Sequence, residues 1–177
     1  ISEMLKENNN DVYGFDIVHK NIRVALKRGI KARYFHIGSR PFPYREAGFD
    51  VVILGDILEH IFDTDDLLRE CYRVLKPKGK LIVTTPNVAS FARRVMLFLG
   101  ISPFLEYSLE LTTNNFPSVG HIRYYTVHTL CEQLHYHKFT CCNVVGNGVY
   151  FTSFMKFSWL GKIFPSFLVS LRSGALM

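Results

Sequence analysis

The chain has 177 residues and a mass of 20.4 kDa, which suits one domain of ordinary size. Apolar residues make up 48% of it and charged residues 20%, which excludes a disordered or fibrous protein. The net charge of +6 suits an anionic ligand, a membrane surface or nucleic acid. No run of Lys and Arg exceeds two residues, so a polybasic arm is excluded.

The cysteines and the chain ends bear on the cellular compartment. The 4 Cys residues include no C-x-x-C pair, so they predict neither a disulfide framework nor a zinc knuckle, and reduced thiols in a cytoplasmic protein are expected. The chain opens on no recognisable signal peptide. The aromatic segment 151–167 is expected to pack on the sheet, with membrane contact as the alternative. Charged residues and a proline within 157–177 argue against a transmembrane helix.

The first half of the chain alternates between helical and strand-like patterns. Residues 1–7 resemble the back half of a helix, and residues 12–17 read as a short buried strand. A second helix carries Ile22, Ala25 and Leu26 at i, i+3, i+4 spacing and stops at Gly29. A strand over 31–37 and a loop over 38–48 follow. The nearly unbroken apolar run at 49–54 is typical of a parallel strand covered on both faces.

The second half continues the alternation. Three acidic residues around Asp65 favour a helix N-terminus, which residues 76–79 would end ahead of a strand over 81–85. Asn87 is expected to cap a helix that ends at Gly100, residues 101–123 have no clear period, and Thr126 caps a last helix before a strand over 139–145. The expected inward-facing residues of these three helices are Leu67, Leu68, Cys71, Tyr72 and Leu75, then Phe91, Val95, Phe98 and Leu99, then Leu130, Cys131 and Leu134.

This alternation predicts an α/β fold with a mainly parallel sheet, because parallel neighbours need crossover helices. Such sheets bind ligands beyond the carboxyl ends of their strands. The residues that end the expected strands are therefore the first candidates: Asp16, Ile37, Gly55 with Asp56, and Pro86 with Asn87. Asp16 would either accept hydrogen bonds from both hydroxyls of a ribose or cap the next helix.

Several motifs occur in a defined order: VYGFDI, PFP ahead of FDVV, D-x-L-E-H, R-V-L-K-P-x-G before a strand ending in TPN, and HIRYYT opening a helix that ends in HKF. With these motifs the chain resembles class I S-adenosylmethionine-dependent methyltransferases, in the small-molecule branch that includes ubiquinone-type and polysaccharide-type O-methyltransferases. The resemblance extends from Ile1 to Gly146 and implies a Rossmann-like, doubly wound fold with helices on both faces of a mainly parallel sheet.

The resemblance also bears on the extent of the domain. The family's first strand and its glycine-rich loop have no counterpart here, and residues 174–177 match only the start of its final antiparallel strand. The expectation is a single partial methyltransferase-like domain over 1–177, with 101–123 as an insertion that forms a lid over the substrate.

The resemblance implies a cofactor site for S-adenosylmethionine. Asp16 would hold the ribose and Ile17 would pack on the adenine. His36 stands where the family has an acidic residue that meets the adenine amine, and the backbone amide of Ile37 would also touch the base. Gly55 and Asp56 would lie beside the methionine part, with Gly55 allowing close backbone approach.

Two histidines are candidates for accepting a proton from the methyl acceptor: His60 and His121. For His60 the alternative is that Glu59 and His60 start a helix and tie the loop together by hydrogen bonds. Arg123 would either face a polar substrate or pair with an acidic residue of the insertion. Asp56, Glu59 and His60 lack the H-E-x-x-H spacing, so no metal site is predicted.

The expected function is methyl transfer from S-adenosylmethionine to an oxygen or nitrogen of a small molecule, by in-line displacement. The alternatives are a non-catalytic, degenerate member that serves as an interaction domain, and a nicotinamide-dependent enzyme, because an acid at the end of the second strand serves both cofactors. No nucleic-acid partner is expected, because the basic clusters do not interleave with aromatic residues. Residues 135–137 are expected on the solvent side.

Overall fold

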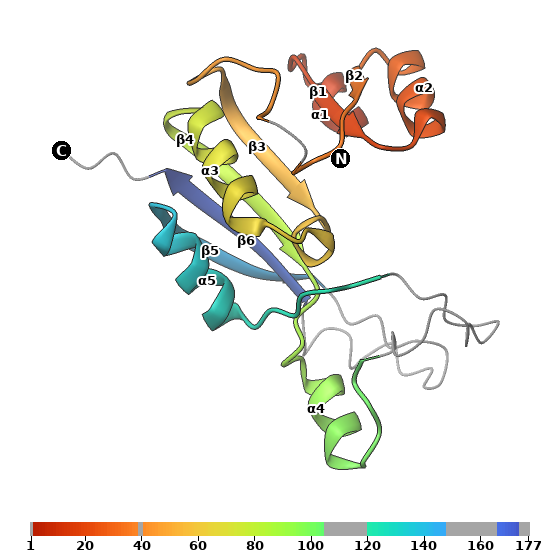
Figure 1. Cartoon of the computed structure of the whole chain (residues 1–177), viewed down its shortest axis with the longest axis vertical. Coiled ribbons are helices and arrows are strands. Elements are labelled where there is room, and N and C mark those ends of the chain that lie inside the picture. Colours follow the sequence, from red (N-terminus) through yellow and green to blue (C-terminus); the bar gives the residue numbers. More distant parts are fainter. Residues whose placement is uncertain (1, 39–40, 105–119, 148–165, 174–177) are drawn as a thin grey trace. The chain divides into compact units, whose positions relative to one another are not determined.

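The computed structural model describes residues 2–38, 41–104, 120–147 and 166–173, the last segment and residues 146–147 by their backbone alone (Figure 1). The chain divides into two compact units, Ile1–Phe42 and Pro43–Met177. Each unit has its own sheet. The single domain over 1–177 therefore stays a prediction, as does the lid, whose residues 105–119 lie outside the described ranges.

The first unit is a pair of parallel strands with two helices. Its elements are α1 (Ser2–Glu7), β1 (Tyr13–Asp16), α2 (His19–Lys27) and β2 (Lys31–Tyr34). Parallel pairing runs from Tyr13 beside Lys31 to Asp16 beside Tyr34. Gly29 has a φ of 74°, which confirms it as the stop of α2. The second strand ends at Tyr34 instead of continuing to residue 37.

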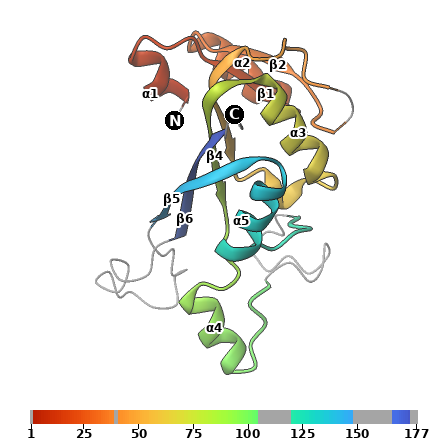
Figure 2. The same ribbon diagram turned by 90° about the vertical axis from the view of Figure 1, so that its left-hand side faces the viewer.

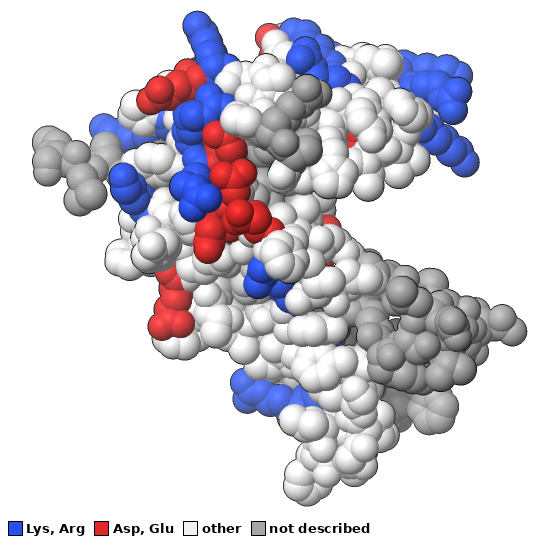
Figure 3. All heavy atoms as spheres, in the orientation of Figure 1, with Lys and Arg blue, Asp and Glu red and all other residues white. Residues whose placement is uncertain are grey.

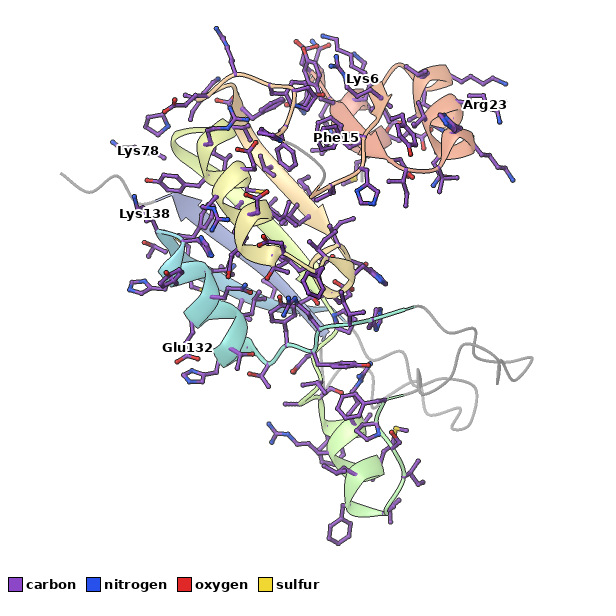
Figure 4. All side chains as sticks on the ribbon, viewed as in Figure 1. Lys6, Phe15, Arg23, Lys78, Glu132 and Lys138 are labelled. Atoms are coloured by element: carbon purple, nitrogen blue, oxygen red, sulfur yellow. The ribbon has the colours of Figure 1, made fainter. Side chains whose placement is uncertain are left out.

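Aromatic packing holds the first unit together. Phe15, labelled in Figure 4, stacks on Phe35 with ring centroids 4.7 Å apart and lies 5.4 Å from Phe42. Ile22 is buried on α2 as expected, but Leu26 is 53% exposed. The expectation for Leu26 is wrong because a two-stranded sheet offers a nine-residue helix little surface to cover.

The second unit has a four-stranded sheet in the order β3-β4-β6-β5. Strands β3 (Phe49–Gly55) and β4 (Leu75–Thr85) are parallel, whereas β6 (Ser166–Ser173) runs antiparallel to both β4 and β5 (Phe139–Asn147). The expected α/β architecture is confirmed, and β6 makes this sheet mixed. The antiparallel strand begins at Ser166, so its expected start at residue 174 is wrong.

Helices α3 (Thr64–Val74) and α5 (Val127–Tyr136) lie on the same face of this sheet (Figures 1 and 2). The Asp63 carboxylate accepts a hydrogen bond from the Asp66 amide at 2.9 Å and caps α3. Thr126 and Thr129 form a capping box on α5, which confirms the predicted start. The expected core residues Leu67, Leu68, Cys71, Leu75, Leu130 and Leu134 are buried, whereas Cys131 and Tyr72 are half-buried.

One polar contact on this face contradicts an expectation. His137 is 7% exposed, and its Nε2 lies 2.9 Å from Oδ1 of Asp65, so its expected place on the solvent side is wrong. At the same end of α5, Tyr72 packs edge-on against Phe139 with ring centroids 5.6 Å apart. Lys138, labelled in Figure 4, places its Nζ 5.7 Å from the Tyr72 ring. His135 and Tyr136 are exposed as expected, so at this end of α5 only His137 departs from the prediction.

The segment 76–79, expected to be a turn, lies inside β4. Lys78 has a φ of 65°, and the pairing with β3 shifts its register between Phe49 and Val51. A Cβ at Gly79 would stand 2.8 Å from the Lys76 carbonyl oxygen, which no side chain tolerates. Gly79 thus allows a bulge in β4, and the strand continues through the residues that were expected to form a turn after α3.

Helix α4 (Phe91–Phe98) departs from the expectation in two ways. Its N-cap is Ser90, while the Asn87 side chain accepts a hydrogen bond from the Ala89 amide at 2.9 Å. Its apolar stripe is exposed, with Phe98 at 89%. No residue of α4 is buried among the described residues, and Figure 3 shows the visible surface over α4 as mostly uncharged with one basic patch. None of the helices in the described ranges has the length and apolarity to cross a bilayer, and the aromatic residues 151–165 lie outside those ranges.

Candidate functional site

In the first unit, Asp16 ends β1 and its carboxylate is held in place by the chain that follows. One oxygen, Oδ1, accepts a hydrogen bond from the Val18 amide at 2.7 Å, and Oδ2 accepts one from the Asn21 side chain at 2.9 Å. Val18, not Asp16, is the N-cap of α2. An ionised carboxylate has about four lone-pair sites, so the two that remain can accept hydrogen bonds from a diol.

The other sequence-predicted residues of the first unit are exposed or half-buried. Ile17 is 57% exposed, His36 is exposed and Ile37 is half-buried. Asp16 and Asn21 also border a hollow of about 450 Å³, lined by residues of α1, β1, α2 and β2. The first unit therefore presents an anchored carboxylate beside a concave surface, with the apolar Ile17 side chain available for contact.

In the second unit, Gly55 and Asp56 stand where β3 ends, beside Thr84 of the parallel strand β4. The Asp56 amide donates to the carbonyl and the hydroxyl oxygens of Thr84 at 3.1 and 2.9 Å, and the Thr84 hydroxyl donates to the Asp56 carboxylate at 3.0 Å. These bonds hold Asp56 at a φ of 51°, which a non-glycine residue rarely adopts. A Cβ at Gly55 would meet nothing closer than 3.9 Å, so the protein's own packing does not require glycine there.

The 3-10 turn η1 (Leu58–His60) follows and carries a buried acid between two histidines. Glu59 is 1% exposed, its Oε2 accepts from the Thr85 hydroxyl at 3.2 Å, and its Oε1 is 4.0 Å from Nε2 of His121. The rings of His60 and His121 lie 4.7 Å apart. The Nδ1 atom of His60 lies 3.3 Å from the Gly120 carbonyl oxygen, so it carries the proton in that contact.

Backbone hydrogen bonds fasten the segment 120–126 across the carboxyl ends of β3 and β4. The amides of Ile122 and Arg123 both donate to the Glu59 carbonyl, at 2.9 and 3.2 Å, and the Val88 amide donates to the Tyr125 carbonyl at 2.9 Å. The Arg123 guanidinium donates to the carbonyl oxygens of Ile61, at 3.1 Å, and of Phe62. These contacts give Arg123 a structural role, and its expected partners in the insertion lie outside the described residues.

Burial dominates the electrostatics of this cluster. Desolvation raises the pKa of the Glu59 carboxyl, and its own backbone amide and the Thr85 hydroxyl only partly offset that shift. Within the described residues, Oε1 of Glu59 has no hydrogen-bond partner. One ligand atom each from Glu59, His60 and His121 lies within 4.8 Å of the others, so a metal ion could approach them, and the absence of a metal site stays a prediction.

The structure thus groups the sequence-predicted residues by unit. Gly55, Asp56, His60 and His121 gather at the carboxyl ends of β3 and β4, whereas Asp16, Ile17, His36 and Ile37 belong to the first unit. Sequence reasoning missed the residues that support the first group: Glu59 as a buried acid, and Thr84 and Thr85 at the end of β4. The sequence feature that could have identified them is the pair of neighbouring parallel strands, because their ends place Gly55 and Asp56 beside Thr84 and Thr85.

Comparisons with known proteins bear on the family and the fold of the chain. A family model described as a methyltransferase domain matches residues 1–83. The ubiquinone biosynthesis O-methyltransferase of Bordetella avium is 29% identical over 126 residues, which are 68% of this chain and 50% of that protein. The chain thus spans half, or less, of the length of the first curated relatives that it matches.

Solved structures extend the likeness to the fold. A SAM-dependent methyltransferase from Methanosarcina mazei matches with a TM-score of 0.67 at 17% identity, over 98% of this chain and 86% of that one. A 1,6-didemethyltoxoflavin-N1-methyltransferase from Burkholderia thailandensis, solved with S-adenosylhomocysteine, matches with a TM-score of 0.59 at 14% identity, over 97% of this chain and 65% of that one. Residues 1–83 thus match a methyltransferase domain, and the chain shares the Rossmann-like fold of solved S-adenosylmethionine-dependent methyltransferases.

Proposed function

We propose that the protein binds S-adenosylmethionine and transfers its methyl group to an oxygen or nitrogen of a small molecule. The observation that carries this proposal is the Asp16 carboxylate at the end of β1, held by Val18 and Asn21 with lone pairs left for a ribose diol. The family match over residues 1–83 and the printed activities of the relatives support it.

Each candidate residue has a stated part in binding. Asp16 accepts hydrogen bonds from the ribose hydroxyls, Ile17 covers one face of the adenine, and His36 with the Ile37 amide meets the edge of the base. Gly55 and Asp56 take the methionine end: the chain leaves room above Gly55, and Asp56 is fixed by Thr84. This division uses the carboxyl ends of parallel strands, where folds of this kind bind ligands.

Methyl transfer depends mainly on the alignment of the acceptor atom with the methyl group. When bound, S-adenosylmethionine supplies an electrophilic methyl group on a sulfonium. The chain's residues hold the acceptor atom in line with that methyl, and such positioning contributes on the order of 7–11 kcal/mol. His60 and His121, which lie side by side at the ends of β3 and β4, are the candidates for taking the acceptor's proton. A positioned base adds about 10²–10⁴-fold.

The test uses the full-length gene product and isothermal titration calorimetry with S-adenosylmethionine. The Asp16→Asn variant keeps an oxygen for the Val18 amide but loses the charge, and charged hydrogen bonds are worth about 1.5–3 kcal/mol. We expect its affinity to fall about 10- to 100-fold. The matched control is Asn21→Ala, which removes one contact of the carboxylate and keeps its charge; its affinity should stay close to that of the wild type.

Three outcomes would reject the proposal. Wild-type protein that binds no S-adenosylmethionine removes its basis. Binding without transfer to any of a panel of phenols, carboxylates and amines would favour a non-catalytic interaction domain. Tighter binding of a nicotinamide dinucleotide than of S-adenosylmethionine in the same titration would favour the nicotinamide-dependent alternative, because an acid at this position serves both ribose-containing cofactors.

A further inference from the structure

Glu59 is a buried carboxylate with only one of its oxygens satisfied. It is 1% exposed, and the Thr85 hydroxyl donates to Oε2 while Oε1 has no hydrogen-bond partner among the described residues. Leaving a buried polar group unpaired costs stability, and more when the group is charged. A buried oxygen without a partner therefore calls for an explanation, and a role in catalysis is one.

The unpaired oxygen points toward the imidazole of His121. The separation between Oε1 and Nε2 is 4.0 Å, too long for a hydrogen bond but within ion-pair range. Catalytic hydrogen bonds are often long in unliganded structures and shorten in the complex with substrate. The Glu59 and His121 side chains are only 2% and 12% exposed, so little water screens their interaction.

The backbone makes this approach a fixed feature of the fold. Glu59 uses its own carbonyl to hold the amides of Ile122 and Arg123, the two residues after His121. The Arg123 guanidinium adds bonds to the carbonyls of Ile61 and Phe62. Glu59 therefore holds the backbone next to His121 through its carbonyl, while its Oε1 faces the His121 side chain.

We propose that Glu59 is a positioning residue that orients the His121 imidazole, so that His121 rather than His60 accepts the proton from the methyl acceptor. This inference rests on the proposed function and adds to it the choice of base. In the step, the acceptor oxygen or nitrogen forms its bond to the methyl carbon while the carbon–sulfur bond breaks and its electron pair stays on sulfur. The acceptor's proton passes to His121, and the Glu59 carboxylate faces the resulting imidazolium.

The groups that face Glu59 and His121 come from four places in the fold. Thr85 approaches from β4, His60 from the same turn, and Asp56 from the end of β3; Tyr125, on the segment of His121, also interacts with Glu59. Burial raises the pKa of Glu59 most and Asp56 raises it further, whereas its own backbone amide, the Thr85 hydroxyl and His60 lower it. A charged His121 would add a further opposite charge and favour the ionised acid.

Metal binding at the same three side chains is the competing use. Bonds of about 2.0–2.1 Å at tetrahedral angles put the ligand atoms of Zn²⁺ about 3.4 Å apart. Oε1 of Glu59 and Nε2 of His121 stand at 4.0 Å, and Nδ1 of His60 is engaged with the Gly120 carbonyl. The arrangement therefore favours a carboxylate–imidazole pair over a preformed metal site.

The first measurement compares wild-type protein with Glu59→Gln, which has the same shape and no charge. We expect kcat to fall at least tenfold, within the range of about 10²–10⁴-fold that a base contributes. The Kd for S-adenosylmethionine should not change. The matched control is His137→Gln, which alters the Asp65–His137 pair and should leave kcat unchanged.

The second measurement is thermal stability, which a merely structural Glu59 would affect in the opposite direction. The raised pKa of Glu59 means that the fold prefers its neutral form, so this preference stabilises the fold at low pH and is lost as pH rises through the raised pKa. The neutral amide should therefore raise Tm at pH 8, and the gain should disappear near pH 4. A lower Tm, or failure of Glu59→Gln to fold, contradicts the proposal.

The remaining outcomes separate this inference from the proposed function. Wild-type protein without S-adenosylmethionine binding removes both. Active wild-type protein with an equally active Glu59→Gln variant overturns only the role of Glu59. Activity that a chelator abolishes and Zn²⁺ or Mg²⁺ restores, in the wild type but not in the variant, shows that Glu59 is a metal ligand and overturns it as well.

Discussion

Two carboxylate–histidine pairs in the second unit show how differently the same chemistry can be used. Asp65 and His137 meet at 2.9 Å, and Asp65 also accepts a hydrogen bond from the Gln133 side chain at 2.9 Å. Glu59 and His121 stand 4.0 Å apart, with one buried oxygen unpaired. The first pair is hydrogen-bonded and links α3 to α5. In the second pair no hydrogen bond forms between Glu59 and His121, which lowers the stability of the fold. Such local conflicts are a feature of functional sites.

Helix ends account for part of the contrast. Asp65 lies in the first turn of α3, where the helix dipole favours negative charge, and His137 is the C-cap of α5, where it favours positive charge. The turn η1 that carries Glu59 has only three residues and offers no comparable dipole. The first pair is thus stabilised by the elements that bear it, while the second depends on strand ends and a connecting segment.

Replacing His121 should have the largest effect on this comparison. We expect His121→Ala to lower kcat by about 10²–10⁴-fold, because no base is left to accept the proton of the methyl acceptor. Affinity for S-adenosylmethionine should be retained, because cofactor binding is assigned to other residues. Single-turnover methyl transfer at saturating cofactor measures this. The companion variant His60→Ala should keep most of the activity, and the reverse ranking of the two variants would refute the choice of His121.

Gly55→Val should weaken cofactor binding with little change in the fold. The protein leaves a Cβ at Gly55 at least 3.9 Å from its neighbours, so the new side chain would fill space assigned to the methionine part. Overpacking typically costs about 1–3 kcal/mol, which corresponds to an affinity loss of about 5–150-fold. Calorimetry gives the affinity and thermal unfolding gives the stability. Gly55→Ala should produce a smaller loss in the same direction, and unchanged affinity in both variants would remove Gly55 from the site.

The sequence alone predicts most of the fold because periodic burial determines it. The apolar spacing in α3 and α5 located Leu67, Leu68 and Leu130, which are all buried. Helix α4 shows the limit: its stripe has the same spacing, yet Phe98 is 89% exposed. Apolar periodicity predicts an amphipathic helix but does not identify the surface against which the helix packs. A helix that does not cover the sheet therefore has the same sequence pattern as one that does.

The candidate site is less accessible to sequence reasoning, because its contacts join distant residues. Strand ends identify Asp16, Gly55 and Asp56 as candidates, since parallel strands finish at one edge. Nothing local in the sequence places His121 beside Glu59; the two amides that donate to the Glu59 carbonyl bring it there. The same limit explains the wrong expectation for His137, whose partner Asp65 lies on another helix.

Replacing His137 tests the structural pair and should affect stability without affecting catalysis. The His137→Ala change leaves Asp65 with Gln133 as its remaining hydrogen-bond donor and removes a side chain that is only 5% exposed. We expect a loss of about 1–3 kcal/mol in the free energy of unfolding, or about 2–4 °C in Tm for each kcal/mol. Urea unfolding at pH 7 measures it. Reduced kcat at full saturation and temperature well below Tm would show that this pair also serves the active site.

The smallest expected effect concerns the pH dependence of stability, because the pKa of Asp65 is lowered in the fold whereas that of Glu59 is raised. Hydrogen bonds from Gln133 and then from His137 lower the pKa of Asp65, so its ionised form stabilises the fold above its ordinary pKa, and this contribution is lost as pH falls through the lowered value. The Asp65 side chain is 54% exposed, so solvent screens it and the effect is modest. Asp65→Asn should therefore be less stable than the wild type at pH 7 and approach it near pH 3.

Glu59→Gln should show the reverse trend with pH, because burial destabilises the ionised Glu59 more than its partners stabilise it. Urea unfolding of the two amide variants and the wild type, over one series of pH values, measures both differences under the same conditions. If both variants follow the same trend, Glu59 is as well satisfied in the fold as Asp65. The 4.0 Å gap to His121 would then be closed in solution even without substrate.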